Sequence, residues 1–371
     1  MANKLIIFSY DFPPSNGGIA RLCQEIAVGQ QTYFEEVIVL TRKKVGESNP
    51  YNFDKVQIIE LPKKRIQCEN AAFTYLRKIK NKENYTILCG VWHPEATISI
   101  IAGFKNVFIL GHGTEFLSGT SKFRKYIWLP IYAKWILGKA KAIIANSNYT
   151  KCLIERINSK VKVVALPLGV NEAFFKPHEL KGNNDKVLRI ASVSRILQFK
   201  GYDFIAKTIA NLSEEYKSKI HWNIGGTGSY LEDLIKLVHQ LGIAKNVSFH
   251  GFIPDEALPD FYNANDIFVL CTREEANSTS VEGFGLVFLE AQSCGIPVIG
   301  VRSGGISDAI EEGNGGWLIE QDNESRLAEL FQCLIDNKEL VVKEGKKARI
   351  RVVEKANWKK YNESLYKILT N

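Results

Sequence analysis

Short runs of apolar residues alternate along the chain with longer segments in which apolar residues recur every three or four positions. In the first half, seven apolar runs predict strands, and they lie at residues 5–9, 35–40, 56–61, 85–91, 106–113, 141–147 and 161–169. Amphipathic segments such as IARLCQEIAVGQQ and NAAFTYLRKIKNK lie between most of them. Short buried strands that alternate with helices predict a parallel sheet covered by helices on both faces.

A polar segment, KPHELKGNNDK at 176–186, interrupts this pattern, which then begins again. Six further runs predict strands, at residues 187–195, 220–226, 247–252, 266–272, 297–302 and 316–320. The fold class is therefore α/β, with two Rossmann-like doubly wound domains at residues 1–175 and 176–354. Ligands bind outside the carboxyl ends of the strands in such sheets, which predicts a site in the cleft between the domains.

Composition agrees with two globular domains and favours a cytoplasmic protein. The 371 residues are 45% hydrophobic and 24% charged, and such a length exceeds what a single core usually reaches. Seven scattered cysteines without CxxC spacing argue against a disulfide framework and against a zinc site. The first apolar run is too short for a signal peptide, and no window has the 18 or more apolar residues of a spanning helix.

The net charge of +8 is concentrated in the first half of the chain. Residues 1–180 contain 25 Lys and Arg against 14 Asp and Glu, whereas the remainder contains 23 against 26. A basic domain attracts nucleic acid, anionic lipid or a phosphorylated substrate, and charge alone does not choose among them. No nucleic-acid-binding motif accompanies the charge, so we expect no nucleic-acid partner.

The loop after the first strand, YDFPPSNGGIARL, contains a candidate anion site. Gly17 and Gly18 permit positive φ and a close backbone approach, and a helix is predicted directly behind them. The free N–H groups of that helix would point at a ligand. The alternative is an ordinary strand-to-helix turn.

Two cations follow the first strand of the second domain, in SVSRILQFKGYDF. Arg195 ends the strand, and Lys200 lies just before Gly201, where a helix is predicted to begin. A guanidinium fork and a point charge at this position can hold a diphosphate. The alternative is that both are solvated surface residues.

The segment VEGFGLVFLEAQSCGIPVIG at 281–300 places two glutamates around an apolar, helix-like run. If Glu282 and Glu290 lie on one helix, eight residues separate them by about 12 Å, the reach of a diphosphate with a sugar at each end. Backbone amides of Phe284, Gly285 and Leu286 would lie between them, at a helix N-terminus. The alternative is that Glu282 only favours the helix dipole and that Glu290 is exposed.

The stretch EGFGLVFLEAQSCGIPVIG resembles the E-x7-E signature of the retaining family 4 glycosyltransferases, which have the glycosyltransferase-B fold. The other motifs occur in the order usual for that family: NGGIAR, GHGTEF, ANSNYTK, PLGVN, SVSRILQFKG, GGTGSY and FHGFIPDEALPDFYNANDIFVL. The resemblance spans nearly the whole chain, and it implies that residues 1–175 bind the acceptor and residues 176–354 bind the nucleotide sugar. It implies transfer of a hexose-type sugar from a nucleotide sugar, with retention at the anomeric carbon and without a metal. We expect a UDP-sugar as the donor ahead of a GDP-sugar.

The resemblance also implies roles for individual residues. Glu290 would bind the ribose hydroxyls, and Glu282 the hydroxyls of the sugar. Arg195 and Lys200 would stabilise the departing diphosphate, together with Gly17, Gly18 and the amides of Phe284, Gly285 and Leu286.

Further implied positions are Ile253, which with Gly251 and Phe252 would border the base, and His112, which would orient the transferred sugar. Negative charge grows on the leaving diphosphate, so fixed donors there lower the barrier. No D-x-D sequence occurs in the chain, so no metal cofactor is expected. One departure from the family is GGISD, where Asp308 occupies a position that is usually glutamate.

Residues 121–138, SKFRKYIWLPIYAKWILG, interleave cations with aromatic rings. Such a segment can lie in the interface of an anionic membrane, and Pro130 argues against an unbroken helix. The alternative is a core helix with a basic outer face. The membrane interpretation suits a glycan acceptor or one carried on undecaprenyl diphosphate, as in bacterial surface-polysaccharide synthesis, on the inner face of the cytoplasmic membrane.

The last residues, 355–371, predict a helix that crosses back onto the first domain, as the resemblance implies, with Trp358, Tyr361 and Tyr366 as its packing face. Two other functions compete with glycosyl transfer. One is a non-catalytic scaffold subunit that binds nucleotide sugars in a polysaccharide assembly complex, and the other is a sugar-nucleotide epimerase on the same fold. Retention of Glu282, Glu290, Arg195 and Lys200 argues against the scaffold, and no separate acid–base carboxylates are evident for the epimerase.

Overall fold

The computed structural model describes residues 3–15, 17–44, 55–178, 187–275 and 278–371. The chain divides into two compact units. The first comprises Met1–Pro167, Asn277–Thr279 and Trp358–Asn371, and the second comprises Leu168–Ala276 and Ser280–Asn357.

The first unit is built on a seven-stranded parallel sheet with the strand order β3-β2-β1-β4-β5-β6-β7. Its strands are β1 (Lys4–Phe8), β2 (Glu36–Arg42), β3 (Val56–Leu61), β4 (Tyr85–Cys89), β5 (Val107–Gly111), β6 (Ala142–Ala145) and β7 (Val163–Ala165). Its main helices are α1 (Gly18–Gln30), α2 (Arg65–Lys78), α3 (Thr97–Ile101), α4 (Lys134–Leu137), α5 (Asn148–Ile157) and α14 (Trp358–Thr370). Shorter helical segments are η1 (Lys82–Asn84), η2 (Trp92–Ala96), η3 (Thr114–Phe116) and η4 (Arg124–Ala133).

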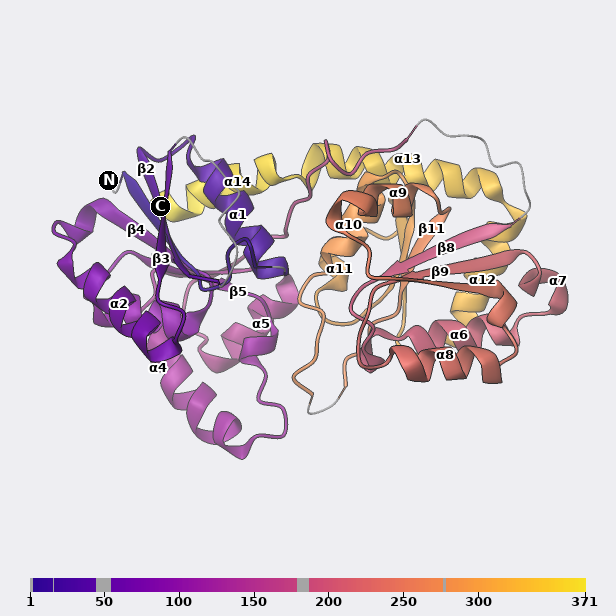
Figure 1. Ribbon diagram of the computed structural model, residues 1–371, viewed down its shortest axis with the longest axis horizontal. Coiled ribbons are helices and arrows are strands. Elements are labelled where there is room, and N and C mark those ends of the chain that lie inside the picture. The colour runs from indigo at the N-terminus through magenta and orange to yellow at the C-terminus, as the bar shows by residue number, and fades with distance from the viewer. Residues whose placement is uncertain (1–2, 16, 45–54, 179–186, 276–277) are drawn as a thin grey trace. The chain divides into compact units, whose positions relative to one another are not determined.

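Both faces of this sheet are buried, which explains why its strands are continuous apolar runs (Figure 1). On one face, Ile6 and Phe8 pack with residues of α2, α4 and α5 in a single core cluster. α14 packs against α1, where Gln30 Nε2 donates a 2.9 Å hydrogen bond to Asn362 Oδ1. Tyr366 also stacks on Tyr33, with ring centroids 4.6 Å apart.

The second unit contains a six-stranded parallel sheet with the order β10-β9-β8-β11-β12-β13. Its strands are β8 (Leu188–Val193), β9 (Ile220–Gly225), β10 (Val247–Gly251), β11 (Ile267–Leu270), β12 (Val298–Val301) and β13 (Gly316–Ile319). Its helices are α6 (Tyr202–Asn211), α7 (Glu214–Lys217), α8 (Leu231–Gln240), α9 (Leu258–Asn263), α10 (Leu286–Ser293), α11 (Ile306–Ala309), α12 (Glu324–Asp336) and α13 (Lys338–Lys355). Three short turns of helix are η5 (Gln198–Lys200), η6 (Ala244–Asn246) and η7 (Asp255–Ala257).

The predicted fold class is confirmed, and each of the thirteen predicted apolar runs overlaps a strand. The strand order changes direction between β1 and β4 in the first unit and between β8 and β11 in the second. Loops that leave neighbouring strands on opposite sides at such a point make the usual ligand site of a doubly wound sheet. These two points therefore locate the residues of interest in each unit.

The expectation that Pro130 interrupts the helix is wrong. Residues 122–137 are helical throughout, and Pro130 lies inside the π-helical segment η4. A π-turn is wider than an α-turn, so the proline ring avoids the carbonyl of the preceding turn, and proline has no N–H to leave unpaired. Within the described ranges, no helix combines the length and the apolar character needed to cross a bilayer.

Candidate active site

Lys200 and Glu282 are in direct contact in the second unit. Lys200 Nζ lies 2.5 Å from Glu282 Oε2, and the two side chains are 11% and 18% exposed. Little water reaches this pair, so each charge depends on the other for compensation. The structure thus brings together two predicted site residues that come from different loops.

The backbone around Lys200 is fixed by close packing. Gly201 has φ +76°, and an added Cβ would collide with the carbonyl oxygen of Cys271, just after β11. The carbonyl of Phe199 accepts a 2.7 Å hydrogen bond from the N–H of Arg273. Lys200 Nζ also lies 5.2 Å from the centroid of the Phe199 ring. Glycine is therefore required at 201 to hold Lys200 at the carboxyl edge of the sheet.

Glu282 is held from the other side by the glycine pair of GGISD. The N–H of Gly305 donates a 2.8 Å hydrogen bond to the carbonyl of Glu282. Gly304 has φ +53°, and a Cβ there would collide with the same carbonyl oxygen. Asp308 lies in α11, where its N–H bonds the carbonyl of Gly305 at 3.0 Å. The two glycines therefore position the predicted sugar-binding glutamate.

The expectation that Glu282 and Glu290 share one helix is wrong. α10 begins at Leu286, because Gly285 precedes it with φ +92° in the left-handed region. A Cβ on Gly285 would lie 2.7 Å from Cδ2 of Phe288, so the glycine is needed for this start. Glu282 lies in the preceding loop, and helical rise does not set its distance from Glu290. Gly285 has no side chain to cap α10, and among the described residues no side-chain cap is seen at the end that begins with Leu286.

Glu290 is buried inside α10, with 4% of its surface exposed. Its Oε2 accepts a 2.8 Å hydrogen bond from the hydroxyl of Tyr262, on α9. The alternative that Glu290 is an exposed surface residue is therefore wrong. Sequence reasoning missed Tyr262, since nothing in DFYNANDIF indicates which way its ring points.

Arg195 and Ile253 occupy the loops that follow β8 and β10. Arg195 is exposed, and among the described residues its side chain has no hydrogen bond or ion pair, so it does not join Lys200 and Glu282. Ile253 packs on Gly225, at the end of β9, where a Cβ would collide with Ile253 Cδ1. The N–H of Gly226 donates a 2.6 Å bond to the carbonyl of Gly251. These loops therefore lie at the carboxyl edge of the same sheet.

The remaining predicted residues, Gly17, Gly18 and His112, belong to the first unit. Gly17 has φ +147° and precedes α1, and added Cβ atoms on Gly17 and Gly18 would meet nothing within 4 Å. His112 Nε2 donates a 2.7 Å hydrogen bond to the carbonyl of Gly90, since a carbonyl can only accept. Its own carbonyl accepts from Asn146 Nδ2 at 3.3 Å. The ring is thus fixed after β5, with Nδ1 left as the acceptor of the neutral form.

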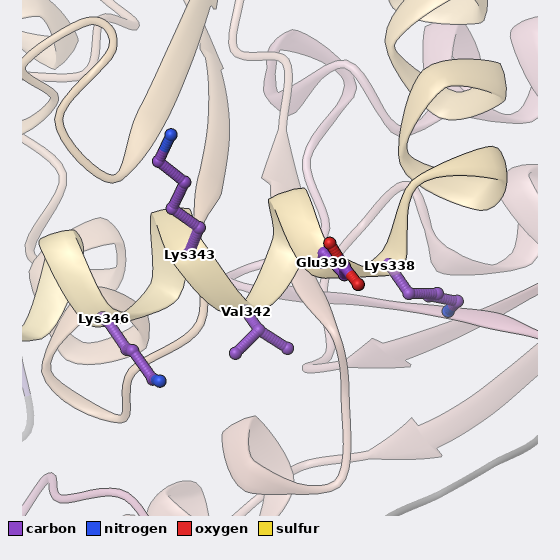
Figure 2. Close-up of a pocket in the computed structure, with 5 residues that line it drawn as sticks. All are labelled: Lys338, Glu339, Val342, Lys343 and Lys346. Carbon is purple, nitrogen blue, oxygen red and sulfur yellow. The ribbon is translucent and has the colours of Figure 1, made fainter.

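Two other features do not add to this site. In the part of the chain that the structure describes, no three His, Cys, Asp or Glu side chains are grouped to hold a metal ion. A pocket of 510 Å³ is lined by five residues of α13: Lys338, Glu339, Val342, Lys343 and Lys346. Figure 2 shows Lys343 and Lys346 pointing to different sides of the helix, so their charges do not converge on one ligand.

Comparison with known proteins places this arrangement in a family. The family model "Glycosyl transferases group 1" matches residues 174–351, the region that holds Arg195, Lys200, Glu282 and Glu290. A GDP-mannose-dependent alpha-(1-6)-phosphatidylinositol monomannoside mannosyltransferase from Mycobacterium tuberculosis is 30% identical, over 96% of this chain and 95% of the relative. The protein of the same description from Mycolicibacterium smegmatis is 25% identical, over 85% of each chain.

Solved structures share the fold at low identity. Sucrose-phosphate synthase from Thermosynechococcus elongatus has a TM-score of 0.79 at 19% identity, covering 99% of this chain and 98% of that one. Anabaena Alr3699/HepE, solved in complex with UDP, has a TM-score of 0.77 at 16% identity and 99% coverage of both chains. The chain therefore belongs to the group 1 glycosyl transferases and is a glycosyltransferase of the glycosyltransferase-B fold.

Proposed function

We propose that this protein is a retaining, metal-independent glycosyltransferase that moves a hexose-type sugar from a nucleotide sugar to a glycan or lipid-linked acceptor. The observation that carries the proposal is the Lys200–Glu282 ion pair at the carboxyl edge of the second sheet. A cation for a diphosphate and a carboxylate for sugar hydroxyls are adjacent there. These are the two kinds of group that a nucleotide sugar requires.

Lys200 supplies positive charge to the departing diphosphate. The exposed guanidinium of Arg195 adds a second cation from the same loop, and the uncapped start of α10 adds amides. Charge develops on the β-phosphate as the bond to the sugar breaks, so these fixed donors stabilise the transition state more than the ground state. This replaces the role that a metal ion would otherwise have.

Glu282 accepts hydrogen bonds from the hydroxyls of the transferred sugar, and Glu290 accepts from the ribose. The Tyr262 hydroxyl fixes the Glu290 carboxylate at 2.8 Å, which prepares it for a ribose diol. Ile253 borders the base. His112, which the resemblance implies as the residue that orients the sugar, is fixed within the first unit through Nε2.

GDP-mannose is the donor to test first. The Mycobacterium tuberculosis and Mycolicibacterium smegmatis relatives carry GDP-mannose in their names, and the former aligns with nearly the whole chain. The expectation from the sequence places UDP-sugars ahead of GDP-sugars. The structures solved with UDP are too distant to support that order, since they are 16% identical.

One exposed surface of the first unit is suited to an acceptor that is bound to a membrane. The 122–137 helix exposes five large apolar side chains, each at least 49% exposed: Phe123, Tyr126, Ile127, Ile131 and Trp135. Exposed lysines flank them, namely Lys122, Lys125 and Lys134. Aromatic rings at headgroup depth with cations on lipid phosphates are typical of peripheral binding to an anionic leaflet. A lipid-linked acceptor of surface-polysaccharide synthesis suits this surface.

A thermal-shift screen tests the proposal. The purified protein is heated with GDP, UDP, ADP and their sugars, with and without EDTA. We expect one nucleotide to raise the melting temperature equally in both conditions, and Glu290→Ala to abolish the shift. Nucleotide binding without transfer to any acceptor or to water would favour the scaffold function, and isomerised nucleotide sugar would favour the epimerase. No shift with any nucleotide would overturn the proposal.

A further inference from the structure

A cluster of aromatic side chains lies at the carboxyl end of β4 and contains none of the residues assigned above to the donor. Trp92 and His93 follow β4, whereas Trp128 and Tyr132 come from the 122–137 helix. The ring centroids of Trp128 and Tyr132 are 4.7 Å apart, and those of His93 and Trp128 are 5.0 Å apart. Trp92 is buried beneath, while the other three rings are partly exposed. Part of each of these three side chains is therefore open to solvent.

Its place in the fold is the usual ligand site of a parallel sheet. The strand order reverses between β1 and β4, so the loop after β4 borders the switch point. The backbone ties this loop to both neighbours. Gly90 N–H bonds the carbonyl of Phe8 in β1, and Gly90 accepts from His112 Nε2, after β5. The cluster therefore adjoins the residue that we place next to the transferred sugar.

A chain of hydrogen bonds fixes the polar edge of the cluster. Thr97 Oγ1 donates to the carbonyl of Trp92 at 3.3 Å, which uses its only hydrogen. Thr97 Oγ1 must then accept from the Tyr132 hydroxyl at 2.9 Å. Tyr132 in turn accepts from His93 Nδ1 at 3.0 Å. The proton of the neutral His93 ring is thus on Nδ1, and Nε2 is left as an acceptor.

Burial lowers the pKa of the His93 ring, the cation Arg65 lowers it further, and Glu69 acts in the opposite direction, so the net shift favours the neutral ring. Nε2 has no hydrogen-bond partner among the described residues, and it is not one of the polar atoms closed off from water. An unpaired acceptor beside partly exposed aromatic faces matches a pyranose ring. Its C–H faces pack on aromatic rings, and its hydroxyls donate hydrogen bonds.

We propose that Trp128, Tyr132 and His93 form the subsite for a pyranose ring of the acceptor, with a sugar hydroxyl donating to His93 Nε2. This rests on the proposed function, because it assumes that a glycan is the acceptor. The same helix also exposes the apolar side chains that we assign to the membrane, and the ring of one of them, Phe123, lies 6.1 Å from that of Trp128. One helix would thereby contact both the sugar of a lipid-linked glycan, through Trp128, and the membrane that holds its lipid, through Trp135.

Two matched variants separate the subsite from the membrane surface. Trp128→Leu and Trp135→Leu remove the same ring from the same helix, one in the cluster and one on the exposed face. Binding of methyl α-mannoside, methyl α-glucoside and methyl N-acetyl-α-glucosaminide is measured by saturation-transfer NMR on the full chain. Binding to vesicles of phosphatidylcholine with phosphatidylglycerol is measured in parallel.

We expect at least one glycoside to bind the wild type, and Trp128→Leu to weaken it by about tenfold. Trp135→Leu should leave glycoside binding unchanged. His93→Phe keeps a ring and removes the acceptor nitrogen, and it should also weaken glycoside binding. The thermal shift with GDP or UDP must be that of wild type in every variant, which shows that the second unit is intact.

Equal glycoside binding by wild type and Trp128→Leu, or no binding of any glycoside by the wild type, would overturn the subsite. Neither result touches the proposed donor chemistry, which the nucleotide shift reports separately. Sugar binding that depends on Trp128 without any nucleotide shift would instead retain the subsite and reject the proposed transferase.

Discussion

Lys200 Nζ and Glu282 Oε2 lie 2.5 Å apart, and both side chains are largely buried. The ammonium group that we expect to bind a diphosphate is therefore already paired with a carboxylate. On the proposed function, donor binding divides this pair: Lys200 would turn to phosphate oxygens, and Glu282 would be released to sugar hydroxyls. The pair therefore holds both groups in place before the donor arrives.

This relationship predicts opposite effects of two substitutions on nucleoside diphosphate binding. Lys200→Ala should weaken the binding of GDP or UDP by at least about tenfold, because charge-assisted hydrogen bonds to the phosphates are lost. Glu282→Gln should strengthen it, because the lysine no longer has a competing partner. Transfer of sugar should fall in both. Titration calorimetry with free GDP or UDP measures the diphosphate affinity of both variants.

A glutamate in an exposed ion pair provides the control. Glu312 pairs with Arg302, and the two side chains are 47% and 41% exposed. Glu312→Gln should leave the diphosphate affinity unchanged. A weakened affinity in Glu282→Gln would show that the carboxylate supports the nucleotide and does not compete with it.

Gly201→Ala should destabilise the second unit more than Gly242→Ala. The two glycines have similar φ values, +76° and +69°, but a Cβ on Gly201 collides with the Cys271 carbonyl whereas Gly242 has open space. Gly242→Ala should cost about 1–2 kcal/mol, the strain of the left-handed conformation alone. Gly201→Ala adds a backbone collision and should exceed about 3 kcal/mol. Urea unfolding compares them, and equal losses would contradict the packing described around Lys200.

The exposed face of the 122–137 helix should bind anionic vesicles. Substitution of Ile131 and Trp135 by serine should abolish co-sedimentation with mixed phosphatidylcholine and phosphatidylglycerol vesicles, because it removes the rings and chains that enter the interface. Raised salt should weaken wild-type binding, since the lysines contribute through charge. Serine at exposed Ile350 of α13 is the control. Unchanged co-sedimentation of the double variant would show that this face does not bind the membrane.

Stability of the first unit should fall as pH rises because of Glu95. Burial raises the pKa of this carboxyl from its ordinary 4.5 to about 8, so the folded state keeps a proton that the unfolded state has lost. The contribution is fully present below pH 4.5 and is lost progressively up to about pH 8, at a slope of up to about 1.4 kcal/mol per pH unit. Glu95→Gln mimics the protonated form, so the slope should disappear in urea unfolding at several pH values. If the dependence of stability on pH persists in Glu95→Gln, other groups cause it.

The sequence predicted the strands well because buried parallel strands are short apolar runs between amphipathic helices, and this pattern is local. It also brought Lys200 forward, because it follows a strand at the carboxyl edge, and Glu282, because it precedes an apolar, helix-like run. The error over Glu282 and Glu290 has a local cause, because Gly285 adopts a left-handed φ and starts the helix late. Composition alone did not reveal that turn.

Contacts between distant side chains could not be predicted in this way. The Tyr262–Glu290 hydrogen bond and the collision that requires glycine at 201 depend on how α9, α10 and β11 pack. The continuous helix through Pro130 depends on a π-turn, which no pattern of residues predicts. The aromatic cluster likewise joins Trp92 to Tyr132 only in the folded sheet.

The most direct test of the account follows the anomeric proton during turnover without metal. The nucleotide sugar that gives the thermal shift is incubated with the protein and EDTA, and NMR records the first anomer of the sugar released to water or to an acceptor. The account predicts turnover at the same rate with and without EDTA, and an α product from an α-linked donor. Turnover that EDTA abolishes, or a β product formed first, would contradict it.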